Sequence, residues 1–189
     1  MTRFDQEKWD RKYAVGPLSE QVSRVVLAYQ HLIPTTGKAL DVAGGAGRHG
    51  VWLAKRGLDV TIVDVSAEGL KQATERALDA GVSITTLCRD LDRGLPEGKW
   101  DLIFSILFFD RRLFSDFRQA LAPGGRLVVI QPTKTNATRH AKPPERFLPE
   151  DTELPELVEG LDIIFYETGW LHEGRFDAVL VAESPNLKS

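Results

Sequence analysis

Cysteine and methionine are almost missing from this chain of 189 residues, which has one of each. The single cysteine, Cys88, has no second cysteine with which to form an internal disulfide. One thiol also cannot build a zinc site of several cysteines, so we expect no metal centre. A lone cysteine in an apolar run such as SITTLC is typical of a small hydrophobic residue in a strand.

Long apolar runs and an excess of positive charge are missing as well. The longest apolar stretch, from Trp100 to Phe109, is far too short to cross a bilayer as a helix and contains Asp101. The formal net charge of -3 does not indicate a surface for nucleic acid or anionic membranes. The run MTRFDQEKWDRKY is charged and lacks the apolar core of a signal peptide. We therefore expect a cytoplasmic protein with no nucleic-acid or membrane partner.

Two phosphate-binding glycine patterns are also lacking, although the chain contains a glycine-rich stretch. The run ALDVAGGAG, residues 39–47, contains neither G-x-G-x-x-G nor G-x-x-x-x-G-K-[ST], so pyrophosphate is not specifically indicated. Three glycines in four positions after an apolar run favour a turn at which the backbone approaches a ligand. The alternative is a tight connection from strand to helix with no ligand.

Short apolar runs alternate with helical patterns through most of the chain. This alternation predicts a parallel, doubly wound α/β sheet. We expect its strands at residues 38–43, 58–64, 83–88, 100–109 and 126–132. One connecting helix is expected to be capped by Ser66 and to bury a stripe made of Leu70, Ala73, Ala77 and Leu78.

The end of the chain departs from this alternation. Two strand-like runs, 161–171 and 175–183, are separated only by the three residues HEG. Three residues cannot hold a parallel crossover, so this pair predicts an antiparallel hairpin. Two helices are expected in front of the sheet, at about 5–13 and 19–32. The polar, proline-rich segment 133–149 is either a binding loop or lid, or a disordered connection.

Acidic residues follow the ends of three predicted strands, where ligands bind in open parallel sheets. Asp41 precedes the glycine turn, and Asp64 lies about twenty residues after Gly44, where a carboxylate can accept hydrogen bonds from ribose hydroxyls. Asp90 is placed to accept from an adenine amino group. The alternatives are a capping or loop role for Asp64 and a solvated loop carboxylate for Asp90.

Taken in order, these stretches resemble the motifs of class I S-adenosylmethionine-dependent methyltransferases. The resemblance rests on ALDVAGGAGRHG, VTIVDVS, CRDLDRGLP, WDLIFSILFFD and ALAPGGRLVV, and covers about residues 37–183. Within that class, WDRKY near the start and the final hairpin are similar to the small tellurite-resistance and thiopurine-type enzymes. The resemblance implies a single-domain, Rossmann-like methyltransferase fold: a mostly parallel, seven-stranded α/β sheet with a C-terminal antiparallel hairpin. It implies helices in residues 1–36 that form a lid, and a cofactor-binding core over residues 37–184.

The resemblance also assigns the cofactor, S-adenosyl-L-methionine, to particular residues. Asp41 and the turn would hold its methionine part, Asp64 its ribose, and the residues after the third strand its adenine. Ser105 would lie beneath the sulfonium, and two aromatic residues of the first helix would close over the site. The implied cofactor-binding residues are Trp9, Tyr13, Asp41, Ala43, Gly44, Gly45, Gly47, Asp64, Val65, Asp90, Leu91 and Ser105. Two positions depart from the family: Ala43 replaces a glycine, and Lys12 replaces an arginine able to make bidentate carboxylate contacts.

The expected activity is methyl transfer to a small-molecule acceptor, with a soft chalcogen nucleophile as one option. No compelling general base is present, and His140 is the weak candidate. Substrate contacts are expected from Phe109, Arg139 and His140. The alternatives are a non-catalytic module that binds S-adenosylmethionine and a nicotinamide-dependent oxidoreductase.

Overall fold

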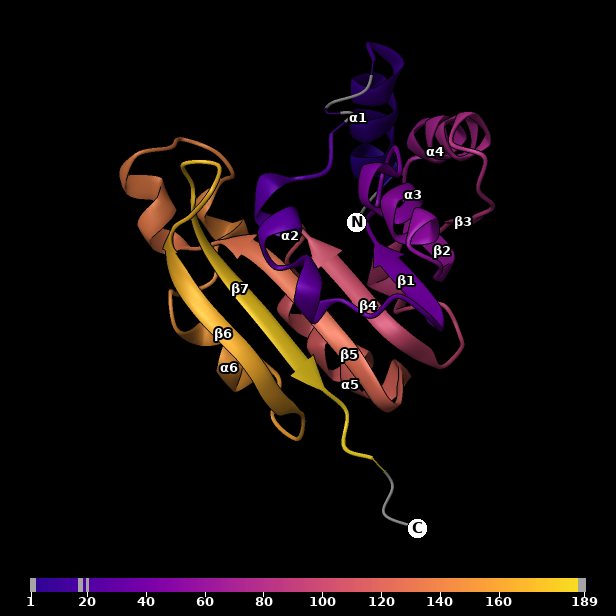
Figure 1. Cartoon of the computed structure of the whole chain (residues 1–189). Coiled ribbons are helices and arrows are strands. Elements are labelled where there is room, and N and C mark those ends of the chain that lie inside the picture. Colours follow the sequence, from indigo (N-terminus) through magenta and orange to yellow (C-terminus); the bar gives the residue numbers. More distant parts are fainter. Residues whose placement is uncertain (1–2, 17–18, 20, 187–189) are drawn as a thin grey trace.

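The computed structural model describes residues 3–16, 19 and 21–186, with side chains described from residue 6 onward. Seven strands form one sheet in the order β3-β2-β1-β4-β5-β7-β6 (Figure 1). The strands are β1 (Lys38–Val42), β2 (Asp59–Asp64), β3 (Thr85–Cys88), β4 (Trp100–Ile106), β5 (Leu121–Pro132), β6 (Asp162–Trp170) and β7 (Phe176–Glu183).

Six α-helices and five 3-10 helices accompany the sheet in the described residues. The α-helices are α1 (Arg3–Ala14), α2 (Arg24–Ala28), α3 (Arg48–Lys55), α4 (Ala67–Asp79), α5 (Phe114–Ala120) and α6 (Glu153–Leu157). The 3-10 helices are η1 (Gln30–Leu32), η2 (Leu91–Arg93), η3 (Arg111–Leu113), η4 (Lys134–Thr138) and η5 (Glu145–Phe147). None of these helices is long and apolar enough to cross a membrane.

The predicted doubly wound sheet is confirmed. Strands β1 to β5 pair in parallel, with β1 between β2 and β4. The hairpin is antiparallel, and its second strand, β7, pairs with both β5 and β6. Strand order therefore reverses between β1 and β4, and their carboxyl ends open side by side at one edge of the sheet.

The sheet is covered on both faces, as its apolar central strands require. One hydrophobic cluster joins the sheet to α2, α3 and α4 through residues such as Val25, Leu53 and Leu70. The other joins it to α5 and α6 through Phe114, Phe117 and Leu154. Helix α1 lies apart from both layers, above the carboxyl ends of the strands and beside α4 (Figure 1).

Several details differ from the expectations. Strand β5 begins at Leu121, five residues before the expected start. The helix expected at 19–32 is limited to α2 and η1, because the 3-10 turn from Gln30 interrupts it. Strand β4 ends at Ile106 rather than Phe109, because Leu107 has the left-handed φ of 60°. Leu78 is 78% exposed and does not belong to the buried stripe of α4, whereas Ser66 caps that helix as expected, its side chain accepting from the Gly69 N–H.

Candidate functional site

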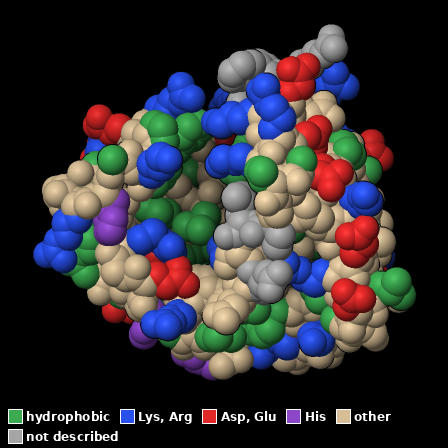
Figure 2. All heavy atoms as spheres, turned by 90° about the horizontal axis from the view of Figure 1, so that it is seen from above, with side chains coloured by type: hydrophobic (Ala, Val, Ile, Leu, Met, Phe, Trp, Pro, Cys, Tyr) green, Lys and Arg blue, Asp and Glu red, His purple; other side chains and the backbone are tan. Residues whose placement is uncertain are grey.

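A cavity of about 270 Å³ lies at the carboxyl ends of β1 and β4, between the glycine turn and α1. Seen from above, the molecule is hollowed in this region, with hydrophobic side chains at the floor and Lys and Arg side chains around the rim (Figure 2). The residues that line the cavity are Trp9, Tyr13, Ser19, Asp41, Ala43, Gly44, Ala46, Arg48, His49, Ile106 and Leu107.

The glycine turn is wound in the left-handed region at alternate positions. Ala43, Gly45 and Gly47 have φ of 54°, 52° and 73°, a conformation that costs a residue with a Cβ about 1–2 kcal/mol. The Gly44 N–H donates to the Val63 carbonyl, and the Gly47 N–H donates to the Gly44 carbonyl. The turn thus closes tightly over the ends of β1 and β2 and leads directly into α3.

Asp41 is a buried carboxylate beneath this turn. The nearby Gly50 N–H favours its charged form, but its Oδ2 has no hydrogen-bond partner among the described residues. Burial, and then the charge of Asp64, raise the pKa of Asp41 to about 7. A Cβ at Gly44 would lie 2.5 Å from that Oδ2, so only glycine leaves room for the carboxylate. The site therefore contains a buried acceptor that lacks its donor.

Asp64 lies at the end of β2 and holds the turn from behind. Its Oδ2 accepts from the Gly45 N–H at 2.9 Å, and its Oδ1 accepts from the Ser66 N–H at 2.8 Å. Burial raises its pKa, and these backbone donors oppose that shift. Asp64 is only 6% exposed and does not line the cavity, although each oxygen keeps a second lone pair.

Helix α1 is tied to the site by three contacts. The Asp10 carboxylate accepts from the Ser66 hydroxyl at 2.6 Å and from the Glu68 N–H at 3.2 Å, and Gln72 donates to the Tyr13 carbonyl. Burial and the charge of Asp64 raise the pKa of Tyr13 to about 12, and the nearby Ala46 N–H opposes that shift. Trp9 and Tyr13 line the cavity, and the Tyr13 hydroxyl lies directly on the glycine turn.

Several residues of the cavity wall were not predicted from the sequence. Arg48 and His49 are the first two residues of α3, and Leu107 is the first residue after β4. His49 is buried, burial lowers its pKa to about 3, and its Nε2 accepts from the Ser23 N–H at 3.4 Å. The signal was present in the chain, because residues just after a ligand-binding turn or a strand end face the same edge of the sheet.

Backbone strain is concentrated at the same place. Among the described residues, Ala43 and Leu107 are the non-glycine residues with positive φ, and both line the cavity. Strained conformations of this kind persist where the surrounding structure holds them and often mark functional sites.

Like Asp64, the predicted residues Gly45 and Gly47 do not line the cavity, and five further predicted residues do not line it either. Val65 and Leu91 are buried at the ends of β2 and β3, and Asp90 accepts from the Asp92 N–H at 2.9 Å. The Ser105 hydroxyl donates to the Phe108 carbonyl, and Phe109 packs against Phe114 in the core. Their assigned roles stay predictions.

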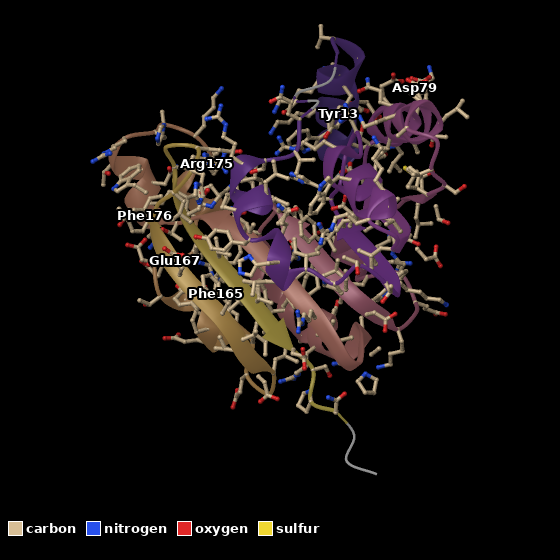
Figure 3. The ribbon with its side chains drawn as sticks, viewed as in Figure 1. Tyr13, Asp79, Phe165, Glu167, Arg175 and Phe176 are labelled. Carbon is tan, nitrogen blue, oxygen red and sulfur yellow. The ribbon has the colours of Figure 1, made fainter. Side chains whose placement is uncertain are left out.

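Arg139 and His140 lie farther from the cavity, beside the hairpin. The Arg139 guanidinium stacks on Trp170 at 3.9 Å, and the His140 Nε2 pairs with the Gly174 carbonyl at 2.9 Å. Neither lines the cavity. The side-chain view shows Tyr13 on α1 and Arg175 at the end of the hairpin on opposite sides of the opening (Figure 3).

Comparison with known proteins gives a consistent picture. Residues 39–125 match the methyltransferase domain family. The chain is 33% identical to a ribosomal protein L11 methyltransferase of Thermus thermophilus over 153 residues, which are 78% of the chain and 58% of that relative. The chain thus spans little more than half the length of this relative.

Two solved structures share the fold. TehB from Haemophilus influenzae has a TM-score of 0.73 at 20% identity, covering 95% of this chain and 66% of TehB. The N-methyltransferase NodS from Bradyrhizobium japonicum, in complex with S-adenosyl-L-homocysteine, has a TM-score of 0.71 at 16% identity, covering 96% of this chain and 98% of NodS.

Proposed function

We propose that residues 39–125 form a class I methyltransferase domain whose cofactor is S-adenosylmethionine. On this premise, the chain transfers the cofactor's methyl group to a small-molecule acceptor. The observation that carries the proposal is Asp41, a buried carboxylate in the cavity wall whose Oδ2 has no hydrogen-bond partner among the described residues. A buried carboxylate oxygen without a donor costs free energy unless a ligand supplies one. The ammonium of the methionine part is such a donor.

The other cofactor contacts follow the strand ends. Asp64 would accept from the ribose hydroxyls through its remaining lone pairs, and Val65, Asp90 and Leu91 would surround the adenine. Trp9 and Tyr13 would close over the ligand, which supports a lid role for part of residues 1–36 above a core of residues 37–184.

When bound, S-adenosylmethionine supplies an activated methyl group on a sulfonium. The task of the protein is to orient the two reactants and exclude water. Ile106 and Leu107 present apolar surface at the end of β4, and Trp9 presents a ring that suits a cationic centre. His49 stays neutral at physiological pH because its pKa is about 3, so it is a poor general base.

The acceptor must then bring its own nucleophile. A thiolate, or a selenium or tellurium anion, reacts without help from a base, which favours a soft chalcogen acceptor. The position of α1 over the cavity favours a small-molecule acceptor over a folded macromolecule. The WDRKY run and the fold shared with TehB support placement in the tellurite-resistance and thiopurine-type subgroup.

A turnover assay tests this function. S-adenosylmethionine with a labelled methyl group is incubated with the protein and with thiols, selenols, chalcogen oxyanions, amines and ribosomal protein or RNA. We expect label in at least one soft small-molecule acceptor, and loss of that activity in Asp41→Ala but not in the exposed control Asp79→Ala. Label only in ribosomal material contradicts the small-molecule acceptor. Cofactor binding without turnover on any acceptor favours a non-catalytic binding module.

A further inference from the structure

We propose that Arg48 binds the carboxylate of the cofactor's methionine part while Asp41 binds its ammonium, so that the two side chains form a receptor for the zwitterion. This inference rests on the proposed function and deepens it. It assigns Arg48, which the resemblance does not, in a chain that has Lys12 where the resemblance implies an arginine.

The charges that line the cavity match a zwitterion. Among the described residues that line the cavity, Asp41 is the acidic side chain, and Arg48 is the side chain with a permanent positive charge. They stand on either side of the turn, Asp41 before it in β1 and Arg48 after it at the start of α3. The pKa of each responds to the charge of the other, so the two groups lie within electrostatic range.

The Arg48 guanidinium lies at the cavity with no ion-pair partner among the described residues. It has no hydrogen bond or ion pair within the part of the chain that the structure describes, and burial is the main cause of its lowered pKa. Glu173, the acid with the strongest effect on it, is already engaged: its Oε1 accepts from the Ser23 hydroxyl and the Arg24 N–H, and its Oε2 accepts from Arg175. A partly desolvated guanidinium of this kind favours an anionic ligand.

Two other cations lie near the opening, but neither lines the cavity. Lys12, which stands where the family has arginine, is exposed and lies 4.2 Å from the centre of the Trp9 ring. Arg175 makes a bidentate pair with Asp177 at 3.1 and 3.0 Å and also contacts Glu173. Arg48 is therefore the group available for the carboxylate, and its planar guanidinium can bind both oxygens together.

Calorimetry with two ligands isolates this contact. S-adenosylhomocysteine carries the ammonium and the carboxylate, whereas its decarboxylated analogue, S-adenosyl-3-thiopropylamine, keeps only the ammonium. We expect Arg48→Met to weaken S-adenosylhomocysteine by about 10- to 100-fold, the scale of a lost charged hydrogen bond, and to leave the decarboxylated analogue within about twofold. Arg48→Lys should recover part of the loss. Lys55→Met, which removes an exposed charge from the same helix, should bind both ligands like wild type.

The outcomes separate this inference from the proposed function. Equal S-adenosylhomocysteine affinity in wild type and Arg48→Met overturns the carboxylate contact, and an equal loss for both ligands overturns it as well. If circular dichroism shows that Arg48→Met does not fold, wild type and Arg48→Lys are compared instead. A carboxylate contact requires wild type to bind S-adenosylhomocysteine more tightly than the decarboxylated analogue, and Arg48→Lys to lose part of that preference. Wild-type protein that binds neither ligand contradicts the proposed function itself.

Discussion

Asp41 and His49 are both buried beside the cavity, and burial moves their pKa values in opposite directions. The pKa of Asp41 rises to about 7 and that of His49 falls to about 3, because burial disfavours the charged form of each. Near neutral pH the His49 ring is neutral and Asp41 is close to its midpoint. The site is therefore sensitive to pH through Asp41.

Asp41→Asn should reveal this sensitivity in the ligand-free protein. The folded pKa of Asp41 lies above its unfolded value of about 3.9, so its contribution to stability is present below pH 4 and is lost as pH rises through 7. Removing the titrating group should make the variant progressively more stable, relative to wild type, between pH 5 and pH 8.

The free energy of unfolding by urea at pH 5, 6.5 and 8 measures this effect. His49 titrates in both proteins and cancels from the difference: its folded pKa is depressed, so its contribution is lost as pH falls from 6.5 toward 3. Asp79→Asn is the exposed control. A constant difference between Asp41→Asn and wild type across this range would contradict the buried titration.

Ala43→Gly tests the strain of the turn. A left-handed alanine costs about 1–2 kcal/mol, and glycine costs about 0.4–1 kcal/mol more entropy on folding, so we expect a net gain of about 0.5–1 kcal/mol. The same substitution within a helix, Ala54→Gly, should lose at least about 1 kcal/mol. Equal losses in the two variants, measured by urea unfolding, would rule out the strain.

Patterns in the sequence predicted the glycine turn of the site, but not the contacts that each residue of the turn makes. Glycine spacing predicted the turn, and the approach of a ligand was the expected reason for Gly45. In the structure, a Cβ at Gly45 would lie 1.9 Å from the Tyr13 hydroxyl. That contact joins residues distant in sequence, so no pattern within the turn contains it. The exposure of Arg48 to the cavity depends on the same tertiary arrangement.

At the scale of elements, Asp10 holds α1 against the start of α4, and Gln72 of α4 donates to the Tyr13 carbonyl. Asp10→Ala removes the acceptor of the Ser66 hydroxyl and the Glu68 N–H, and we expect α1 to detach more often while the sheet stays folded. Tryptic cleavage after Lys8, Arg11 or Lys12 should become several-fold faster, with little change in the melting temperature. Cleavage at the wild-type rate would show that α1 does not depend on this contact.

The segment 133–149 approaches the opening from the other side. Asn136 accepts from the Phe176 N–H and anchors the segment to the hairpin. Burial lowers the pKa of Lys12 in α1, and the charges of Lys8 and Lys142 lower it further. Because Lys142 belongs to the segment, the segment lies within electrostatic range of α1. We propose that the two elements form a lid over bound cofactor.

Limited proteolysis tests the lid. S-adenosylhomocysteine should slow tryptic cleavage after Arg139 and Arg146 clearly, because closure orders and covers the segment. NAD should have no such effect. The same rate with and without S-adenosylhomocysteine would remove the lid role and the expected substrate contacts of Arg139 and His140.

The order of strands in the hairpin shows what the sequence pattern predicted and what it left open. Three connecting residues predicted the antiparallel pair, but not which strand joins β5. Strand β7 occupies the inner position, and its central residues are all buried, whereas β6 forms the edge and exposes Ile163 and Ile164. The unbroken apolar run of β7 is the feature that distinguishes a strand with neighbours on both sides.

At the scale of the whole molecule, two halves of the sheet meet at an opening with a buried acid and a guanidinium in its wall. The fold was predictable because alternating strands and helices allow few arrangements. The chemistry of the opening depends on side chains from α1, the turn, α3 and the end of β4, which only the folded chain brings together. We infer that this opening binds S-adenosylmethionine.

Calorimetric titration of the wild-type protein with S-adenosylhomocysteine, compared with NAD under the same conditions, tests that claim most directly. We predict one binding site per chain for S-adenosylhomocysteine and no measurable heat from NAD. The dissociation constant for S-adenosylhomocysteine should be in the micromolar range, which corresponds to a binding free energy of about -8 kcal/mol. Binding of NAD in preference to S-adenosylhomocysteine, or of neither, would contradict the account.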